Sequence, residues 1–237
     1  MKKGTTRALA VSGSPRAEKG ATEIVLSAFV QGYREGGGLA KVINPYRMNI
    51  APCRGCFKCW TKTPGKCVMD DDMGGVLDDI QTADAIILAT PVYHYTMSEG
   101  VKRLLERTMP ILEPKLSIGL DGKTTHARIG PRGQWAVLVS TCGFPEQDVF
   151  DPLRATFARI CGMMEWRIAG ELLRTMSGLL LSKDPRAMDG SAGYLKMVSN
   201  AGRMFAEGKP IDAGLRSYLE QELVPKEEYF RIVNEWF

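Results

Sequence analysis

At residues 84–90 the chain reads DAIILAT, the most strand-like run in the sequence. This run shows no alternation of polar and apolar residues, which is typical of a strand buried on both faces. Strands of this kind lie at the centre of parallel sheets that carry helices on both sides. We therefore predict that residues 84–90 form a central strand of a parallel sheet.

The segments before this strand predict a βαβ unit. Residues 7–12 read RALAVS, a short apolar run that ends in the turn-forming stretch SGSPRAEKG. Apolar residues at helical spacing predict a helix from about Thr22 to the glycines at 36–38, and a second strand follows at 39–44. A further helix begins at Asp72.

The alternation continues beyond the central strand. The pattern predicts helices near 98–107 and 149–161, and strands at 135–140 and 166–173. Five strands alternating with helices indicate an α/β fold with a flavodoxin-like, doubly wound five-stranded parallel sheet. We expect residues 1–175 to form this domain and residues 176–237 to be a C-terminal helical extension of the same domain.

The extension carries two recognisable helical patterns. Apolar residues at 195–205 mark one helix, and Pro225 opens a last one. Its apolar stripe predicts core packing, or a dimer contact if it is exposed, and consists of Tyr229, Phe230, Val233, Trp236 and Phe237.

Composition excludes several classes of protein. The 31 Lys and Arg residues against 27 Asp and Glu residues give a net charge of +4, too slight for a nucleic-acid-binding protein but suited to phosphorylated small molecules. No stretch approaches the roughly 20 apolar residues of a membrane helix. The start, MKKGTTRALAVSGSPR, lacks a signal-peptide pattern. We expect a cytoplasmic protein with neither a membrane nor a nucleic-acid partner.

The loop after the first strand has the chemistry of a phosphate site. Hydroxyls, backbone amides and a guanidinium gather in residues 12–16, and Thr22 lies at the start of the next helix. A terminal phosphate finds charge and hydrogen bonds at such a helix N-terminus. The loop is neither a dinucleotide-binding nor a nucleoside-triphosphate loop. The alternative is an ordinary strand-to-helix turn.

Two more loops follow buried strands. Residues 90–98 read TPVYHYTMS, and residues 141–144 read TCGF after the fourth strand. The first and third strands flank the switch point of a flavodoxin-like sheet, where ligands collect. An aromatic, amide-rich segment there can lie against a planar ring, and His94 is placed to reach it. The alternative is that the tyrosines pack under a loop.

Four of the six cysteines cluster as Cys53-x2-Cys56-x2-Cys59-x7-Cys67. Cytoplasmic cysteines stay reduced, so a cluster indicates metal or redox chemistry before disulfides. Two-residue gaps are typical of 4Fe-4S binding, zinc sites more often use two separated pairs, and a third interpretation is a loop of plain thiols. Cys142 and Cys161 have no base nearby in sequence, which disfavours a nucleophilic-thiol enzyme.

Taken as a set, these motifs resemble the NADPH-dependent FMN reductase and iron-sulfur flavoprotein family. The resemblance spans about Arg7 to Arg107 and rests on SGSPR at 12–16, PCRGCFKCW at 52–60, PGKC at 64–67, DDM at 71–73, and ATPVY at 89–93 with Met97 and Ser98. It implies FMN bound at the carboxyl edge of the sheet. It also implies reduction of an acceptor at the expense of a reduced nicotinamide or an electron carrier.

The resemblance also implies a set of site residues. It places the FMN phosphate at Ser12, Ser14, Arg16, Ala21 and Thr22; the flavin ring along Pro91, Val92, Tyr93, His94, Tyr95, Thr96, Met97 and Ser98; and the far wall at Thr141, Cys142, Gly143 and Phe144. The four clustered cysteines align with cluster ligands of the iron-sulfur members, although many flavin reductases keep similar cysteines without a cluster. Ala21 replaces a frequent Asn, and His94-Tyr95-Thr96 replaces a glycine-containing loop, which is expected to narrow the acceptor site.

The leading prediction is an FMN-dependent NAD(P)H oxidoreductase whose acceptor is a quinone, a nitro compound or free flavin. No side chain is expected to act as an acid or base, because the redox chemistry belongs to the cofactor. One alternative is an iron-sulfur flavoprotein with a 4Fe-4S cluster that exchanges electrons with ferredoxin. Another is a non-enzymatic flavodoxin-like electron carrier or zinc-binding module. The resemblance implies a homodimer or homotetramer.

Overall fold

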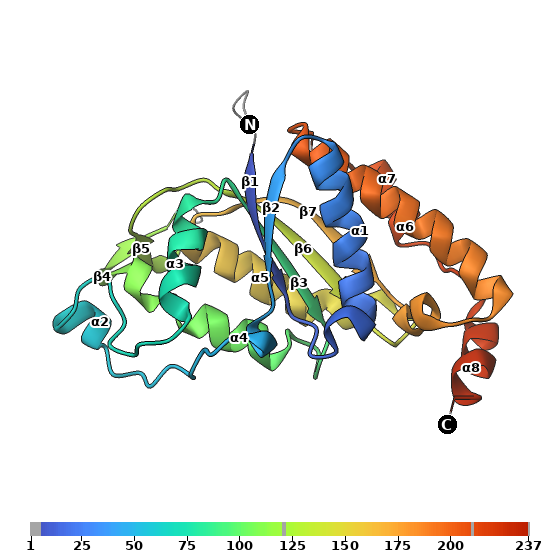
Figure 1. Cartoon of the computed structure of the whole chain (residues 1–237), viewed down its shortest axis with the longest axis horizontal. Helices are drawn as coiled ribbons and strands as arrows, with labels where there is room; N and C mark the ends of the chain where they lie inside the picture. The colour runs from blue at the N-terminus through green and yellow to red at the C-terminus, as the bar shows by residue number, and fades with distance from the viewer. Residues whose placement is uncertain (1–5, 120–121, 210, 237) are drawn as a thin grey trace.

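The structure, a computed structural model, describes residues 6–119, 122–209 and 211–236. A parallel five-stranded sheet with the order β2-β1-β3-β6-β7 forms its centre (Figure 1). The strands are β1 (Arg7–Ser12), β2 (Leu39–Ile43), β3 (Ala85–Pro91), β6 (Trp135–Thr141) and β7 (Arg167–Arg174). The flavodoxin-like fold is confirmed, and the run at residues 84–90 is its central strand.

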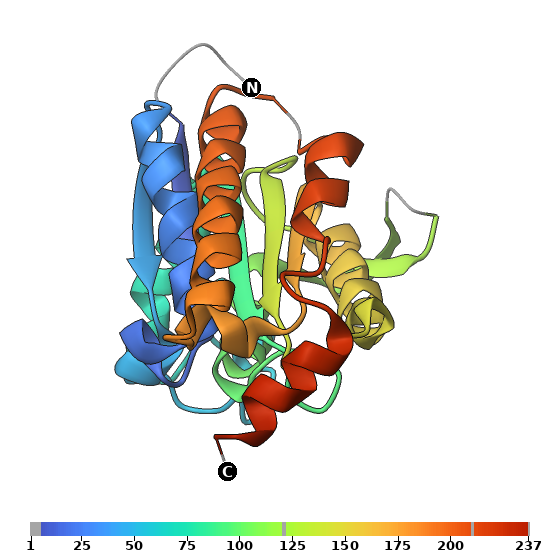
Figure 2. The same ribbon diagram turned by 90° about the vertical axis from the view of Figure 1, so that its right-hand side faces the viewer.

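Helices cover both faces of the sheet (Figures 1 and 2). One face carries α1 (Ala21–Glu35), α6 (Pro185–Ala206) and α7 (Ala213–Leu219), and the other carries α3 (Met73–Thr82), α4 (Glu99–Glu106) and α5 (Asp151–Met164). The remaining helices are α2 (Lys58–Thr61), α8 (Lys226–Asn234) and the 3-10 turns η1 (Ala17–Lys19), η2 (Pro45–Arg47), η3 (Met109–Ile111), η4 (Gln147–Phe150) and η5 (Ser177–Leu181). No helix in the described ranges has the length and apolarity needed to cross a membrane.

The central strand divides its side chains between two cores. Ile87, like Ala85 and Ala89 on either side of it, packs with α1 and α6, whereas Ile86 and Leu88 pack with the helices of the opposite face. All five side chains are buried. Alternate residues of a strand point to opposite faces, so an unbroken apolar run is what a sheet covered on both sides requires.

Backbone contact joins α1 to α6. A Cβ atom on Gly32 would overlap the carbonyl oxygen of Ser199, and one on Gly202 would overlap that of Phe29. Only glycine permits so close an approach of two helices. The longest helix beyond residue 175 therefore lies directly on α1. The predicted division of the chain at residue 175 stays a prediction.

An antiparallel hairpin escaped the sequence analysis. It consists of β4 (Leu112–Ile118) and β5 (Thr124–Arg128), and it projects from the body of the molecule (Figure 2). Its first strand contains Pro114 and shifts register between Leu112 and Leu116. A proline at a bulge interrupts the pattern by which strands are recognised, which explains the omission.

The predicted stripe of the last helix is only partly correct. Tyr229 is buried and Val233 is half-buried, but Phe230 and Trp236 are 45% and 47% exposed. Ile232 takes the buried place instead, three residues after Tyr229, because those two positions share the face that meets the protein. Phe237 lies outside the described residues.

The helix contact gives a test of the fold. The variants G32A and G202A should each lower the free energy of unfolding by about 3 kcal/mol, the upper end for overpacking, because backbone atoms cannot move aside. Urea unfolding measures the change. The control is G75A in α3, where the added methyl group meets nothing within 4 Å and should raise stability by up to about 1 kcal/mol. Wild-type stability in G32A would contradict the close packing.

Candidate functional site

A cleft opens at the carboxyl ends of β3 and β6. It has a volume of about 570 Å³, and its walls are Val92, Tyr93, His94, Tyr95, Cys142, Phe144 and Val149. The amide of Val92 donates to the carbonyl of Thr141 at 2.9 Å, which joins the two loops. The structure thus brings the second and third predicted segments together at the carboxyl edge of the sheet, next to the switch point between β1 and β3. Val149 was not predicted.

The loop after β3 presents its aromatic rings to this cleft. Tyr93 and Thr96 pair through both backbone hydrogen bonds, at 2.9 and 3.1 Å, around a two-residue turn. His94 and Tyr95 have φ values of 47° and 63°, a region that glycine and asparagine occupy more readily. Tyr93 is 46% exposed and Tyr95 is 56% exposed, so neither ring packs beneath the loop. Both are free to contact a ligand.

The loops after β1 and β3 are held as one unit. The amide of Gly13 donates to the carbonyl of Ala89 at 2.7 Å, and the hydroxyl of Ser98 donates to the carbonyl of Gly13 at 2.8 Å. The amide of Ser98 in turn donates to the hydroxyl of Thr90 at 2.9 Å. Met97 and Ser98 are consequently buried supports of the loop and do not line the cleft.

The predicted phosphate residues lie beside the cleft and not in its walls. The hydroxyl of Ser12 donates to Glu23, and those of Thr22 and Thr141 share a hydrogen bond of 2.6 Å. The hydroxyls of Ser12 and Thr22 therefore form hydrogen bonds with other side chains of the protein. Ala21 is the first residue of α1, and Arg16 is exposed.

The N-terminus of α1 nevertheless keeps the features of an anion site. Its N-cap is Gly20, which provides no side-chain hydrogen bond, so the first amides of the helix have no capping side chain. A Cβ atom on Gly20 would overlap the hydroxyl oxygen of Ser14. The absence of a Cβ lets the hydroxyl of Ser14 lie directly against the N-terminus of α1. Asn44, which the sequence analysis did not single out, donates to the carbonyl of Ser14 at 3.0 Å and fixes this loop.

The four clustered cysteines line a second cavity of about 350 Å³. Cys53, Cys56, Cys59 and Cys67 surround it together with Phe57, Val68, Met109 and other residues of the loop. All four are free thiols. Burial, followed by the charges of neighbouring cysteines, raises the pKa of Cys59. Within the described residues, no three His, Cys, Asp or Glu side chains lie close enough to hold a metal ion. The thiols thus surround a space and do not converge on one point.

Arg107 holds the two ends of the cysteine loop together through hydrogen bonds. Its guanidinium donates to the carbonyl of Ala51 at 2.6 Å, before the first cysteine. It also donates to both carboxylate oxygens of Asp71 at 2.7 and 2.8 Å and lies 3.5 Å from the sulfur of Cys67. The side chains of Arg107 and Asp71 are only 1% and 5% exposed. A paired, bidentate arrangement is what allows two such charges to be buried.

Trp60 fastens the middle of the loop. Its indole donates to the carbonyl of Met109 at 2.9 Å, and its ring lies 4.8 Å from that of His126 in the projecting hairpin. The two histidines thus differ in place, since His94 lines the cleft and His126 supports the cysteine loop.

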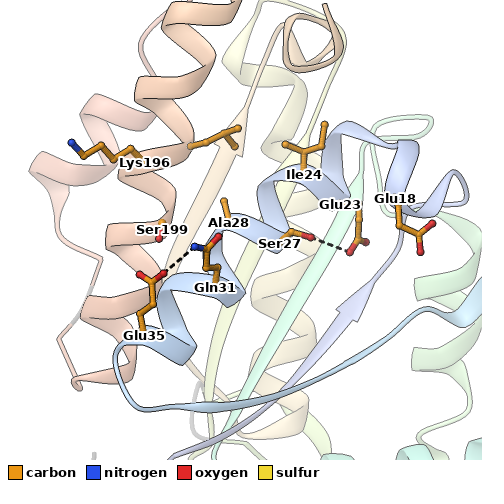
Figure 3. Close-up of a pocket in the computed structure, with 10 residues that line it drawn as sticks. Glu18, Glu23, Ile24, Ser27, Ala28, Gln31, Glu35, Lys196 and Ser199 are labelled. Atoms are coloured by element: carbon orange, nitrogen blue, oxygen red, sulfur yellow. Dashed lines mark hydrogen bonds between the residues drawn. The ribbon is translucent and has the colours of Figure 1, made fainter.

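A third hollow, between α1 and α6, has a volume of about 660 Å³ (Figure 3). Its α1 side carries Glu23, which accepts from Ser27, and Glu35, which accepts from Gln31 (Figure 3). It contains none of the predicted cleft or cysteine residues. A wall of carboxylates repels phosphorylated ligands, so the cleft and not this hollow is the candidate site.

The parallel sheet of this strand order defines a flavodoxin-like protein, and the cleft at its carboxyl edge is the candidate ligand site. The family model for NADPH-dependent FMN reductase matches residues 6–164. The chain belongs to this family.

Curated relatives match part of the chain, and solved structures share its fold. An iron-sulfur flavoprotein of Methanocaldococcus jannaschii is 35% identical over 105 residues, which cover 44% of this chain and 53% of the relative. The chain spans about half the length of the curated relatives that it matches. An NAD(P)H:quinone oxidoreductase from Methanothermobacter marburgensis superposes with a TM-score of 0.62 at 15% identity, covering 85% of this chain and 98% of the other. An FMN-dependent NADH-azoreductase from Bacillus anthracis, in complex with FMN, gives 0.60 at 14% identity, with 85% and 100% covered.

The Arg107–Asp71 pair predicts a pH dependence of stability. Burial alone would raise the pKa of Asp71, but hydrogen bonds from Arg107, Ala51 and Met73 outweigh it, and the pKa lies below its ordinary value of 3.8. A carboxyl with a depressed folded pKa stabilises the protein above the unfolded pKa, and this stabilisation is lost as the pH falls through the folded value. D71N should therefore cost about 3–5 kcal/mol at pH 7, because Arg107 loses its partner.

Urea unfolding of wild type and D71N from pH 7 down to pH 3 measures this effect. The gap in unfolding free energy should stay constant above the unfolded pKa and narrow only below about pH 4. A gap that closes already between pH 7 and pH 5 would contradict the assignment to Asp71.

Proposed function

We propose that the protein is an FMN-dependent NAD(P)H oxidoreductase. The observation that carries the proposal is the cleft at the carboxyl ends of β3 and β6, lined by Tyr93, Tyr95 and Phe144, in a chain of this family. All three rings are about half exposed, at 46%, 56% and 57%. Exposed aromatic rings around a concave site suit a planar ligand.

The residues present fit FMN in two parts. The uncapped N-terminus of α1, with Ser14 and exposed Arg16 beside it, offers amides, a hydroxyl and a positive charge to the phosphate. The cleft offers apolar and aromatic walls to the ring. When bound, FMN supplies the redox chemistry between a reduced nicotinamide and an acceptor.

The task of the chain is positional. The proposed phosphate residues are Ser12, Ser14, Arg16, Ala21 and Thr22, of which Ser12 and Thr22 act by fixing the loop. One wall of the proposed flavin site consists of residues 91–97, some of which line the cleft while others support it. Ser98 links this wall to Gly13 through a hydrogen bond. The other wall consists of residues 141–144. The aromatic rings orient the bound ring and keep water from it. No side chain is required to move a proton.

We propose a small acceptor such as a quinone, a nitro compound or free flavin. The turn at His94 and Tyr95 favours a small acceptor. Two large side chains lie there, whereas the family resemblance leads one to expect a glycine-containing loop, and they narrow the space beside the proposed ring site. Homodimeric or homotetrameric assembly and a cytoplasmic location stay predictions.

Flavin binding tests the proposal. Apo-protein titrated with FMN should quench flavin fluorescence at one equivalent, and Y93A should weaken the affinity about tenfold through loss of an aromatic contact. NAD(P)H oxidation with a quinone should fall in parallel at limiting FMN. The matched control is Y218A, which removes a tyrosine of similar exposure, 43%, from α7. Full FMN occupancy and turnover in Y93A would count against this cleft as the site.

A second candidate function is that of an iron-sulfur flavoprotein. Four free thiols line one cavity, a donor set that suits a 4Fe-4S cluster. The curated relatives carry the name iron-sulfur flavoprotein. Cys53, Cys56, Cys59 and Cys67 would be the ligands, and ferredoxin would be the electron partner.

Removal of one thiol tests the cluster. Anaerobically purified C56S should lose iron and acid-labile sulfide together while keeping FMN. The control is C161A, because Cys161 is buried outside the loop and burial, with a smaller effect of Glu171, raises its pKa to about 12. Iron, sulfide and flavin are assayed on one sample with its absorbance spectrum. Wild-type protein with flavin but without iron would reject the cluster and leave the reductase proposal standing.

A further inference from the structure

The segment Cys142–Phe144, one wall of the cleft, is held entirely from the C-terminal side of the chain. The carbonyl of Cys142 accepts from the amide of Ser177 at 2.9 Å, and the carbonyl of Phe144 accepts from the amide of Met176 at 3.0 Å. The amide of Cys142 donates to the carbonyl of Arg174 at 2.9 Å. All three contacts come from the end of β7 and the segment after it.

The remaining carbonyl of the wall accepts from a side chain of the last helix. The hydroxyl of Tyr229, in α8, donates to the carbonyl of Gly143 across 86 positions of sequence. Figure 2 shows α8 beyond the carboxyl edge of the sheet. Lys226 of the same helix also pairs with Glu146, although both partners are half exposed and the pair contributes little.

The ring of Tyr229 has a fixed place of its own. It is 4% exposed and belongs to a small apolar cluster with Met176, Leu179, Val224 and Ile232, separate from the two cores that cover the sheet. The hydroxyl reaches out of this cluster to the wall of the cleft. The three carbonyls of residues 142–144 thus accept hydrogen bonds from residues 176, 177 and 229. The large side chain of this wall that lines the cleft is the exposed ring of Phe144.

We propose that Tyr229 is a positioning residue for the flavin site, acting through Gly143 to set the place of Phe144. The inference rests on the proposed function, since it assumes that FMN occupies the cleft. Tyr229 lines no part of the cleft itself. Its hydroxyl preorders the wall before the ligand arrives, so that less ordering is needed when FMN binds.

The test is Y229F, which removes one hydroxyl and keeps the ring in its apolar cluster. FMN affinity of the apo-protein should fall about three- to tenfold, the effect of one net hydrogen bond. Hydrogen exchange of the apo-protein should become faster at residues 142–146. The matched control is Y218F in the same tail, because the Tyr218 hydroxyl has no hydrogen-bond partner in the part of the chain that the structure describes. That control should leave both measurements unchanged.

A double-mutant cycle distinguishes positioning from general support. In an F144A background the Y229F change should alter FMN affinity less than twofold, because the side chain that it positions is gone. If Y229F changes FMN affinity equally in the wild-type and F144A backgrounds, the proposal that Tyr229 acts by positioning Phe144 is overturned. The exchange measurement needs no ligand, so it stands even where a variant binds FMN poorly.

The outcomes separate the two proposals. Wild-type protein that binds FMN while Y229F binds it equally well overturns the role of Tyr229 and leaves the reductase proposal intact. Wild-type protein that does not bind FMN overturns both. Weaker binding in Y229F, with faster exchange confined to residues 142–146 and α8, supports the inference.

Discussion

Water must be kept from both faces of β3 and β6, and the arrangement of the molecule follows from this constraint. Strands as apolar as these are stable only between two layers of helices. The layer on one side is complete only with α6, whose backbone meets that of α1 at Gly32 and Gly202. Since helices occupy both faces, the ends of the strands are what remains for a ligand. The cleft lies at one of those ends.

The two candidate sites are joined by one short helix. Ser98, immediately before α4, ties the loop after β3 to Gly13, and Arg107, immediately after α4, closes the cysteine loop through Asp71. Each end of the helix is thus fixed by buried hydrogen bonds to a different site. The hairpin of β4 and β5 adds support on the cysteine side through His126.

The sequence predicted the parts of the structure that depend on local pattern. Residues 84–90 identified the central strand because positions 85–89 are all apolar, and the helix from Thr22 was recognisable from its spacing and its glycine stop. Tyr93 and Phe144 each follow a predicted parallel strand, so the sequence predicted that both lie at the carboxyl edge of the sheet. The hairpin was missed because Pro114 interrupts its pattern and because the contact of Trp60 with His126 supports it from outside. The hydrogen-bonding roles of Arg107 and Tyr229 were missed because each side chain bonds to a residue 36 or 86 positions away, and no periodicity indicates such a pairing.

The length of α4 has an evolutionary consequence. Each residue of an α-helix advances about 1.5 Å and turns the chain by about 100°, so Ser98 and Arg107 hold a fixed spacing and a fixed mutual angle. Insertion or deletion of a single residue between them would swing the guanidinium away from Asp71 while leaving the serine in place. In descendants of this gene the eight residues of Glu99–Glu106 should therefore tolerate substitution and resist any change in number.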